Sequence, residues 1–211
     1  MGSVVVDFQP SLLDVAEVGV GPLAGRVQRT VLGCGAWVDV LPGWFAGADE
    51  VFAGLVEDVP WRAERRQMYD AVVDVPRLVH TYGIGEQLPH PSLTEARDAL
   101  SAHYADELGE PFVTAGCCYY RDGQDSVAWH GDNLGRGRSG DTMVAIVSFG
   151  SPRKLCLRPI GGPTEVTHAL GHGDLIVMGG SCQRTWEHAV PKTARPVGPR
   201  ISVQFRPRNV F

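Results

Sequence analysis

The spacing of hydrophobic residues changes near residue 110. Ahead of that point, ADEVFAGLVEDV places Phe52, Leu55 and Val56 at helical intervals, which predicts one helix. Residues 92–95 (SLTE) have the form of a capping box and predict a second helix from about residue 92 to residue 108. The segments RVQRTVLG and AWVDVLPG mix short apolar stretches with turn residues and are expected to be strands. The first half of the chain should therefore combine helices with a few strands.

From residue 111 onward, short strand-like segments alternate with tight turns. CCYYRDG, TMVAIVSFG, LIVMGG and RISVQFRP read as strands, and KLCLRPI follows TMVAIVSFG after the turn GSPR, which predicts a hairpin. Many strands in succession favour a sandwich or a barrel. We expect an α+β fold with a mainly β core at residues 111–209. Residues 1–110 are expected to form an N-terminal extension that shapes the substrate site, within one structural unit.

Composition and charge narrow the functional classes. The chain has 211 residues and a formal net charge of −5, which argues against strong nonspecific binding of nucleic acid. A local basic cluster at positions 62, 65 and 66 is compatible with that balance. Five cysteines without a CxxC spacing indicate a reduced, cytoplasmic protein without a structural zinc site. We expect no secretory signal, since no lysine or arginine precedes Arg26, and no membrane span, since no apolar run is long enough.

The triplet His-x-Asp occurs twice in the second half of the chain. Residues two apart on a strand point to the same face, so either pair could bind one metal ion from one side. In GHGDL, Gly171 and Gly173 bracket the histidine ahead of a buried strand, which a turn explains. In WHGDN, His130 and Asp132 lead from a strand into the glycine-rich segment NLGRGRSGD, where catalytic ligands commonly lie. We predict that the first pair binds metal and that the second is a turn.

A catalytic iron site with two histidines and one carboxylate needs a further histidine. His168, His172 and His188 lie downstream, and a strand ending at His188 could return beside the first pair. In the C-terminal segment RISVQFR, Arg200 and Arg206 are six residues apart and project from the same face of a strand. Two guanidinium groups on one face suit a small dianion with a carboxylate at each end. An edge strand with one solvated face is the alternative.

Taken together, these motifs resemble the AlkB family of iron(II)- and 2-oxoglutarate-dependent dioxygenases. The resemblance is carried by YYRDGQDSVAWHGD, IVSFGSPRKLCLRP, HGDLIVMGGSCQRTWEHAVP and RISVQFRP, with MYDAVVDVPRLVHTYG upstream. It implies a double-stranded β-helix, or jelly roll, whose N-terminal helical and strand extension forms a nucleotide-recognition lid. The cofactors implied are iron(II), 2-oxoglutarate and O₂. The iron ligands implied, which are also the catalytic residues, are His130, Asp132 and His188.

The same resemblance suggests which residues surround the cosubstrate. Arg200 matches the arginine that pairs with the distal carboxylate of 2-oxoglutarate, and Arg206 matches a second arginine near the cosubstrate and the metal. Tyr120 matches a tyrosine that hydrogen-bonds the cosubstrate. Cys118 stands two residues before it, where the family usually has asparagine, so one hydrogen bond to 2-oxoglutarate is expected to be weaker or supplied elsewhere. After HGD, Asn-Leu replaces the acidic residues that repair members often carry.

The function implied is oxidative demethylation of 1-methyladenine and 3-methylcytosine in DNA or RNA, on a single-stranded or flipped base. In PRLVHTYG, Tyr82 is expected to contact the base and Arg77 a phosphate; a proline-initiated turn with Tyr82 in the core is the alternative. A dioxygenase acting on a protein side chain or a small metabolite is a second hypothesis. A β-barrel binding module without turnover is a third. We expect a monomer that does not associate with membranes.

Overall fold

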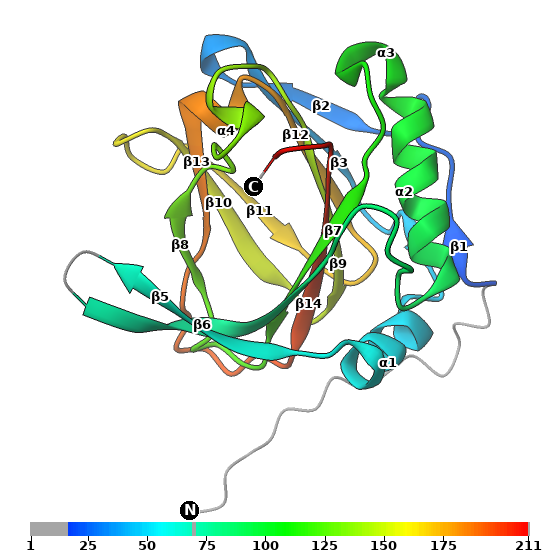
Figure 1. The fold of residues 1–211 in the computed structure, drawn as a ribbon, viewed down its shortest axis with the longest axis vertical. Coiled ribbons are helices and arrows are strands. Elements are labelled where there is room, and N and C mark those ends of the chain that lie inside the picture. Colours follow the sequence, from blue (N-terminus) through cyan, green and yellow to red (C-terminus); the bar gives the residue numbers. More distant parts are fainter. Residues whose placement is uncertain (1–16, 69–70, 211) are drawn as a thin grey trace, which may run out of the picture.

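The fold is built from two β-sheets that face each other, with helices on one side (Figure 1). The computed structural model describes residues 17–68 and 71–210. Within them the helices are α1 (Ala48–Asp58), α2 (Pro91–His103), α3 (Ala105–Leu108) and α4 (Cys182–Thr185). The strands are β1 (Gly19–Val20), β2 (Gln28–Val31), β3 (Ala36–Leu41), β4 (Phe45–Ala46), β5 (Arg62–Met68), β6 (Ala71–Tyr82), β7 (Thr114–Tyr120), β8 (Val127–His130), β9 (Val144–Gly150), β10 (Arg153–Pro159), β11 (Val166–Leu170), β12 (Leu175–Gly180), β13 (Trp186–Val190) and β14 (Arg200–Arg206).

The larger sheet has eight strands in the order β2-β3-β12-β9-β14-β7-β6-β5, and we call it the major sheet. The minor sheet has four strands in the order β11-β10-β13-β8, and β1 pairs separately with β4. All of these pairings are antiparallel. The non-consecutive order within both sheets is that of a jelly roll, as expected from the sequence.

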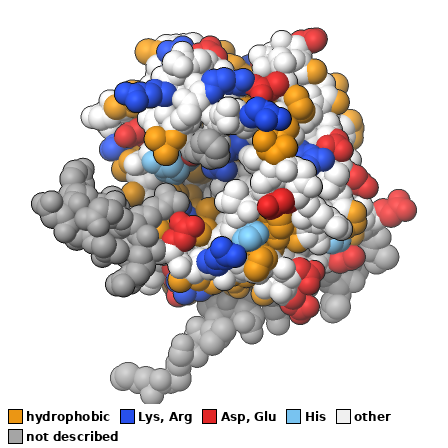
Figure 2. Space-filling view, viewed as in Figure 1, with side chains coloured by type: hydrophobic (Ala, Val, Ile, Leu, Met, Phe, Trp, Pro, Cys, Tyr) orange, Lys and Arg blue, Asp and Glu red, His pale blue; other side chains and the backbone are white. Residues whose placement is uncertain are grey.

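Helices α1, α2 and α3 cover one face of the major sheet, and the minor sheet covers the opposite face. Figure 1 shows α1, α2 and α3 on the right and the minor sheet on the left. Figure 2 shows acidic side chains along the right and lower right of this view, on the helical side. Lysine and arginine side chains are more frequent in its upper part, over the end of the barrel where α4 lies. Charge is therefore distributed unevenly over this face.

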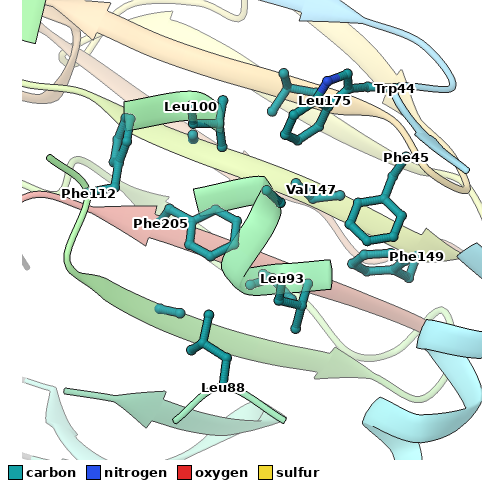
Figure 3. Close-up of a cluster of buried hydrophobic side chains, with 14 of the residues drawn as sticks. Trp44, Phe45, Leu88, Leu93, Leu100, Phe112, Val147, Phe149, Leu175 and Phe205 are labelled. Atoms are coloured by element: carbon teal, nitrogen blue, oxygen red, sulfur yellow. The ribbon is translucent and has the colours of Figure 1, made fainter. Parts of the chain in front are cut away.

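Two hydrophobic clusters hold these layers together. One lies between the helices and the major sheet and includes Leu93 and Leu100 of α2 with Val147 and Phe205 of the sheet (Figure 3). The other lies between the two sheets, where Ile146 and its neighbours on the major sheet meet apolar residues of the minor sheet. Because successive strand residues point to opposite faces, the central strands contribute to both clusters. This explains why β9 is buried along its whole length.

The predicted hairpin between TMVAIVSFG and KLCLRPI is wrong. The two segments form β9 and β10, which are consecutive but lie in different sheets: β9 pairs with β12 and β14, and β10 pairs with β11 and β13. The turn between them begins at Gly150, whose φ of 87° is in the left-handed region that favours glycine. The turn thus carries the chain from one sheet to the other instead of folding it back on its own neighbour.

Both predicted helices are present, but the second begins and ends differently. The N-cap of α2 is His90, whose side chain accepts a hydrogen bond from the Ser92 backbone, and Pro91 occupies the first turn. Ser92 is the second residue of α2, so it is not the cap of a capping box. The α2 helix ends at His103, and α3 follows as a separate short helix.

Residues before 111 are hydrogen-bonded into the same sheet as residues after it. The β3 strand pairs with β12 over six residues, and β6 pairs with β7. The segment PRLVHTY lies within β6 and is a strand, not a turn. No helix in the described ranges is long and apolar enough to cross a membrane.

Candidate active site

Three side chains from two paired strands and the loop after one of them converge at a single point. His130 is the last residue of β8 and lies opposite His188 of β13 in the sheet register. The centroids of the two imidazole rings are 4.2 Å apart. Asp132 follows two residues after His130, and the potential ligand atoms of the three residues all lie within 4.8 Å of one another. The described residues contain no other such group of histidine, cysteine or carboxylate side chains.

Hydrogen bonds leave one ligand atom free on each of two members of this triad. Nδ1 of His130 lies 2.9 Å from the carbonyl oxygen of Ala128. A carbonyl only accepts, so Nδ1 must carry the proton and the lone pair is on Nε2. Oδ2 of Asp132 accepts from Nε of Arg206 at 3.0 Å and from Nη2 at 2.9 Å. The other carboxylate oxygen, Oδ1, lies 3.9 Å from Nε2 of His130.

Electrostatics keep the triad in the protonation state that binds metal. Burial alone would raise the pKa of Asp132, but the Arg206 guanidinium, with His188 and His130, lowers it to about 2. Burial, together with the nearby charge of His130, lowers the pKa of His188 to about 3. At neutral pH the triad therefore offers a carboxylate and a neutral imidazole. Two imidazoles and one carboxylate on one side of a point form the donor set of non-haem iron(II) oxygenases, so the residues present fit this ion.

A buried candidate anion site lies further along the inner face of β14. Arg200 is 2% exposed, and its Nη2 donates to Oγ of Ser148 at 2.7 Å. Its Nε and Nη1 atoms are buried without a hydrogen-bond partner among the described residues. The Tyr120 ring centroid lies 5.2 Å from the Arg200 guanidinium carbon. A carboxylate ligand would satisfy a buried guanidinium with two unpaired donors, which fits 2-oxoglutarate.

Comparison with known proteins agrees with this geometry. The family model of the 2OG-Fe(II) oxygenase superfamily matches residues 40–206. Alpha-ketoglutarate-dependent dioxygenase alkB homolog 3 of Bos taurus is 31% identical, over 91% of this chain and 70% of that protein. The Homo sapiens protein of the same name is 30% identical, over 94% of this chain and 73% of that protein. The chain belongs to the AlkB family.

A more distant relative and two solved structures are also similar to this AlkB family chain. The Homo sapiens protein named DNA oxidative demethylase ALKBH2 is 27% identical, over 76% of this chain and 69% of that protein. A 2OG-Fe(II) oxygenase family oxidoreductase from Burkholderia pseudomallei has a TM-score of 0.56 at 15% identity, over 82% of this chain and 86% of that one. A prolyl hydroxylase from Trichoplax adhaerens has the same TM-score at 11% identity, over 81% and 83% of the two chains. Both structures share the fold.

Membership of the AlkB family makes the protein an oxidoreductase, namely a dioxygenase that depends on iron(II) and 2-oxoglutarate. The family and the jelly-roll fold expected from the sequence are both confirmed. The third hypothesis, a binding module without turnover, receives no support from these relatives, because the superfamily and the named relatives are oxygenases.

Cys118 lies on the inner face of the major sheet beside the anion site of this AlkB family member. Its Sγ atom accepts a hydrogen bond from Nε of Arg77 at 3.3 Å and lies 3.9 Å from Oε1 of Gln204. Nη1 of Arg77 donates to the Ser126 carbonyl oxygen at 3.2 Å. The Arg77 guanidinium is thus directed into the barrel wall next to Cys118. This geometry does not support the predicted contact between Arg77 and a substrate phosphate.

Tyr82, which was predicted to contact the base, is largely buried in this AlkB family member. It is 9% exposed and belongs to the hydrophobic cluster under the helices. Arg77 and Tyr82 are an odd number of residues apart on β6 and point to opposite faces of the sheet. Burial raises the pKa of Tyr82 to about 12. The structure therefore favours the alternative in which Tyr82 is a core residue, although on a strand and not in a turn.

The second His-x-Asp triplet forms the turn expected from the sequence. Gly173 has a φ of 78°, and the two carboxylate oxygens of Asp174 accept from the Gly171 and Gly43 backbone amides at 2.7 and 2.8 Å. His172 forms an ion pair with Asp49 at 3.0 Å. These side chains hold the turn against α1 and lie outside the triad.

Two residues that shape the triad were missed by sequence reasoning. Oε1 of Gln183 accepts a hydrogen bond from the Asp132 backbone amide at 3.0 Å. A Cβ atom on Gly116 would lie 2.8 Å from Nη1 of Arg206, so the absence of a side chain makes room for that guanidinium. Gln183 precedes His188 by five residues, within a motif that carries the family resemblance, and that position was the only signal available.

Proposed function

We propose that the protein removes methyl groups oxidatively from N-alkylated bases of the 1-methyladenine and 3-methylcytosine type in DNA or RNA. The observation that carries this proposal is the similarity, over 94% of the chain, to a relative named as an AlkB homologue, together with the weaker similarity to a protein named as a DNA oxidative demethylase. The products expected are succinate, CO₂, formaldehyde and the unmodified base.

In this proposal, His130, Asp132 and His188 hold iron(II) through atoms that no other side chain occupies. Nε2 of His130 and Oδ1 of Asp132 are left free because Nδ1 and Oδ2 are engaged by Ala128 and Arg206. When bound, iron(II) with 2-oxoglutarate activates O₂ and supplies the oxidising power that hydroxylates the N-methyl group. Arg206 fixes the orientation of the Asp132 carboxylate and offsets its charge in the buried site.

Arg200 and Tyr120 would hold the distal carboxylate of 2-oxoglutarate. Arg200 supplies two unpaired donors, and Ser148 orients its guanidinium. Burial raises the pKa of Tyr120 to about 12, so its phenol stays protonated and can donate a hydrogen bond. Cys118 adjoins this site with a thiol where the family usually has an amide. We propose that its contribution to cosubstrate binding is small, since its Sγ already accepts from Arg77.

The substrate base must leave the stack to reach the triad, so a flipped or single-stranded nucleotide is expected. Leu134, two residues after Asp132, is 65% exposed on the loop that leaves the site. The upper part of the face in Figure 2, where lysine and arginine side chains are more frequent, could follow a phosphate backbone. The nucleotide-recognition lid within residues 1–110 stays a prediction from the sequence. The same holds for the monomeric state and the cytoplasmic location.

The proposal is tested by incubating the protein with iron(II), 2-oxoglutarate, ascorbate and matched methylated or unmethylated oligonucleotides of DNA and RNA. Mass spectrometry should show loss of the methyl group only with iron, and the Asp132→Ala variant should be inactive. Metal-dependent succinate formation without demethylation of any oligonucleotide would contradict the substrate and leave the dioxygenase assignment in place. Binding to oligonucleotides that falls steeply with salt would support contact with the phosphate backbone.

A further inference from the structure

The loop that carries Asp132 is attached to α4 by a buried side chain. Gln183 of α4 is 1% exposed, and its Oε1 accepts from the Asp132 backbone amide at 3.0 Å. Because the Asp132 backbone N–H can only donate, the side-chain oxygen of Gln183 must point toward it. Exchanging the oxygen and nitrogen of the Gln183 amide would place two donors against each other. Its Nε2 is buried without a hydrogen-bond partner among the described residues. An unpaired buried donor is unfavourable, so a function for this side chain is indicated.

The backbone of α4 also contacts this loop directly. A Cβ atom on Gly131 would collide with the backbone carbonyl oxygen of Gln183 and would lie 3.2 Å from that of Trp186. Only glycine lets the His130–Asp132 segment approach α4 so closely. The loop therefore rests on α4 through both a side-chain hydrogen bond and close backbone packing.

The α4 helix is in turn fixed to its surroundings. Oγ of Ser181 donates to the Cys34 carbonyl oxygen at 2.6 Å, and Oγ1 of Thr185 donates to the Ser181 carbonyl oxygen at 2.9 Å. Directly after α4 begins β13, which carries His188. One anchored element thus positions His188 through the chain and contacts Asp132 through Gln183.

We propose that Gln183 is a positioning residue for the metal centre: it fixes the backbone of Asp132 relative to His188, so that the triad is preformed before metal binds. Two contacts then define Asp132, with Arg206 acting on its carboxylate and Gln183 on its backbone. The inference rests on the proposed role of Asp132 as an iron ligand. Residues that orient metal ligands typically change metal affinity by about 10- to 100-fold when they are replaced.

The test is a titration of the metal-free full-length chain with Mn(II), followed by electron paramagnetic resonance, together with the melting temperature of each metal-free variant. Gln183→Met keeps the size of the side chain and removes the acceptor; it should weaken Mn(II) binding by about 10- to 100-fold. Gln183→Glu keeps an acceptor and should stay within a few-fold of the unmodified chain. Arg184→Ala is the matched control on α4, because Arg184 pairs with the exposed side chain of Asp141 and not with the triad.

Similar melting temperatures, with affinity lost in Gln183→Met and retained in Gln183→Glu and Arg184→Ala, would support the inference. Unchanged affinity in Gln183→Met, or an equal loss in Arg184→Ala, would overturn it while leaving the iron site intact. If Gln183→Met fails to fold, a folded Gln183→Glu that binds Mn(II) at least 10-fold more weakly than the unmodified chain would overturn the inference. If Asp132→Ala binds Mn(II) as tightly as the unmodified chain, the proposed iron site itself is wrong and the role of Gln183 is excluded with it.

Discussion

Two buried arginines flank the ring of Tyr120, and the structure predicts opposite consequences of replacing them. The guanidinium carbons of Arg200 and Arg153 lie 5.2 and 5.7 Å from the ring centroid. Arg153 donates to three backbone carbonyl oxygens at 2.8–2.9 Å. Arg200 donates one hydrogen bond, to Ser148, and two of its nitrogens have no partner in the described part of the chain. The donors of Arg153 are therefore used within the fold, whereas Arg200 keeps two donors that are available to a ligand.

Arg200→Met should impair cosubstrate binding without destabilising the metal-free protein. Removing one partner of a buried, hydrogen-bonded charge pair costs about 2–5 kcal/mol. The dissociation constant of 2-oxoglutarate should therefore rise by roughly 30-fold to several thousand-fold. The metal-free chain loses a buried cation that has no carboxylate partner, so its melting temperature should stay the same or rise.

Arg153→Met should have the reverse effect. Three backbone carbonyl groups would lose their donor at about 1 kcal/mol each, or about 3 kcal/mol in all. For a chain of this length the melting temperature should fall by roughly 6–12 °C. Calorimetric titration of 2-oxoglutarate with Mn(II) present, and scanning calorimetry without metal, would measure both quantities. The reasoning fails if Arg200→Met binds 2-oxoglutarate normally, or if it lowers the melting temperature as much as Arg153→Met.

Further predictions concern the two His-x-Asp triplets, the room beside Arg206 and a partly buried histidine. Asp174→Ala should lower the free energy of unfolding by about 1–3 kcal/mol, because two backbone amides lose their acceptor, and should leave Mn(II) affinity unchanged. Asp132→Ala should abolish Mn(II) binding; equal affinities of the two variants would contradict the assignment. Gly116→Ala should displace Arg206 and weaken Mn(II) binding several-fold, which the same titration would detect, while a variant with normal affinity would show that the guanidinium can adjust. Burial lowers the pKa of His168, so the folded state resists its protonation and the chain should lose stability as pH falls below about 6.5. His168→Leu should therefore flatten the dependence of melting temperature on pH in that range, and an unchanged slope would exclude this histidine as the cause.

The predictions that were correct relied on short-range patterns in the sequence. The side chains of a strand alternate, so the shared face of Arg200 and Arg206 follows from their spacing, and Ile201 indeed belongs to the helix-side cluster. The distinction between the two His-x-Asp triplets also came from neighbouring residues, since glycines on both sides of His172 indicated a turn. Such inferences need no knowledge of which strands pair.

The features that the sequence did not reveal depend on which strands pair and on long-range contacts. Whether β9 and β10 form a hairpin depends on which sheet each joins, and a glycine turn permits both outcomes. Whether the Tyr82 side chain points into the core depends on which face of β6 packs against the helices. The sequence of β6 alone does not show this. Gln183 contacts Asp132 across 51 residues of chain, so no local pattern connects the two. Sequence reasoning thus found the residues that carry chemistry more readily than those that orient them.

The inner face of β14 explains how one strand can serve both halves of the site. Its alternate residues Arg200, Ser202, Gln204 and Arg206 are polar and turned away from the helix-side cluster. Nε2 of Gln204 donates to Oγ of Ser202 at 2.8 Å, and Oε1 of Gln204 accepts from Arg206 at 3.3 Å, so this stripe is connected by hydrogen bonds up to Asp132. The other face packs against the helices, which fixes the register of the strand. A shift of the β14 register by one residue would turn both arginines toward the helices and place apolar side chains beside the triad. Packing on the helical side therefore keeps Arg200 and Arg206 on the inner face, beside the triad and the proposed cosubstrate site.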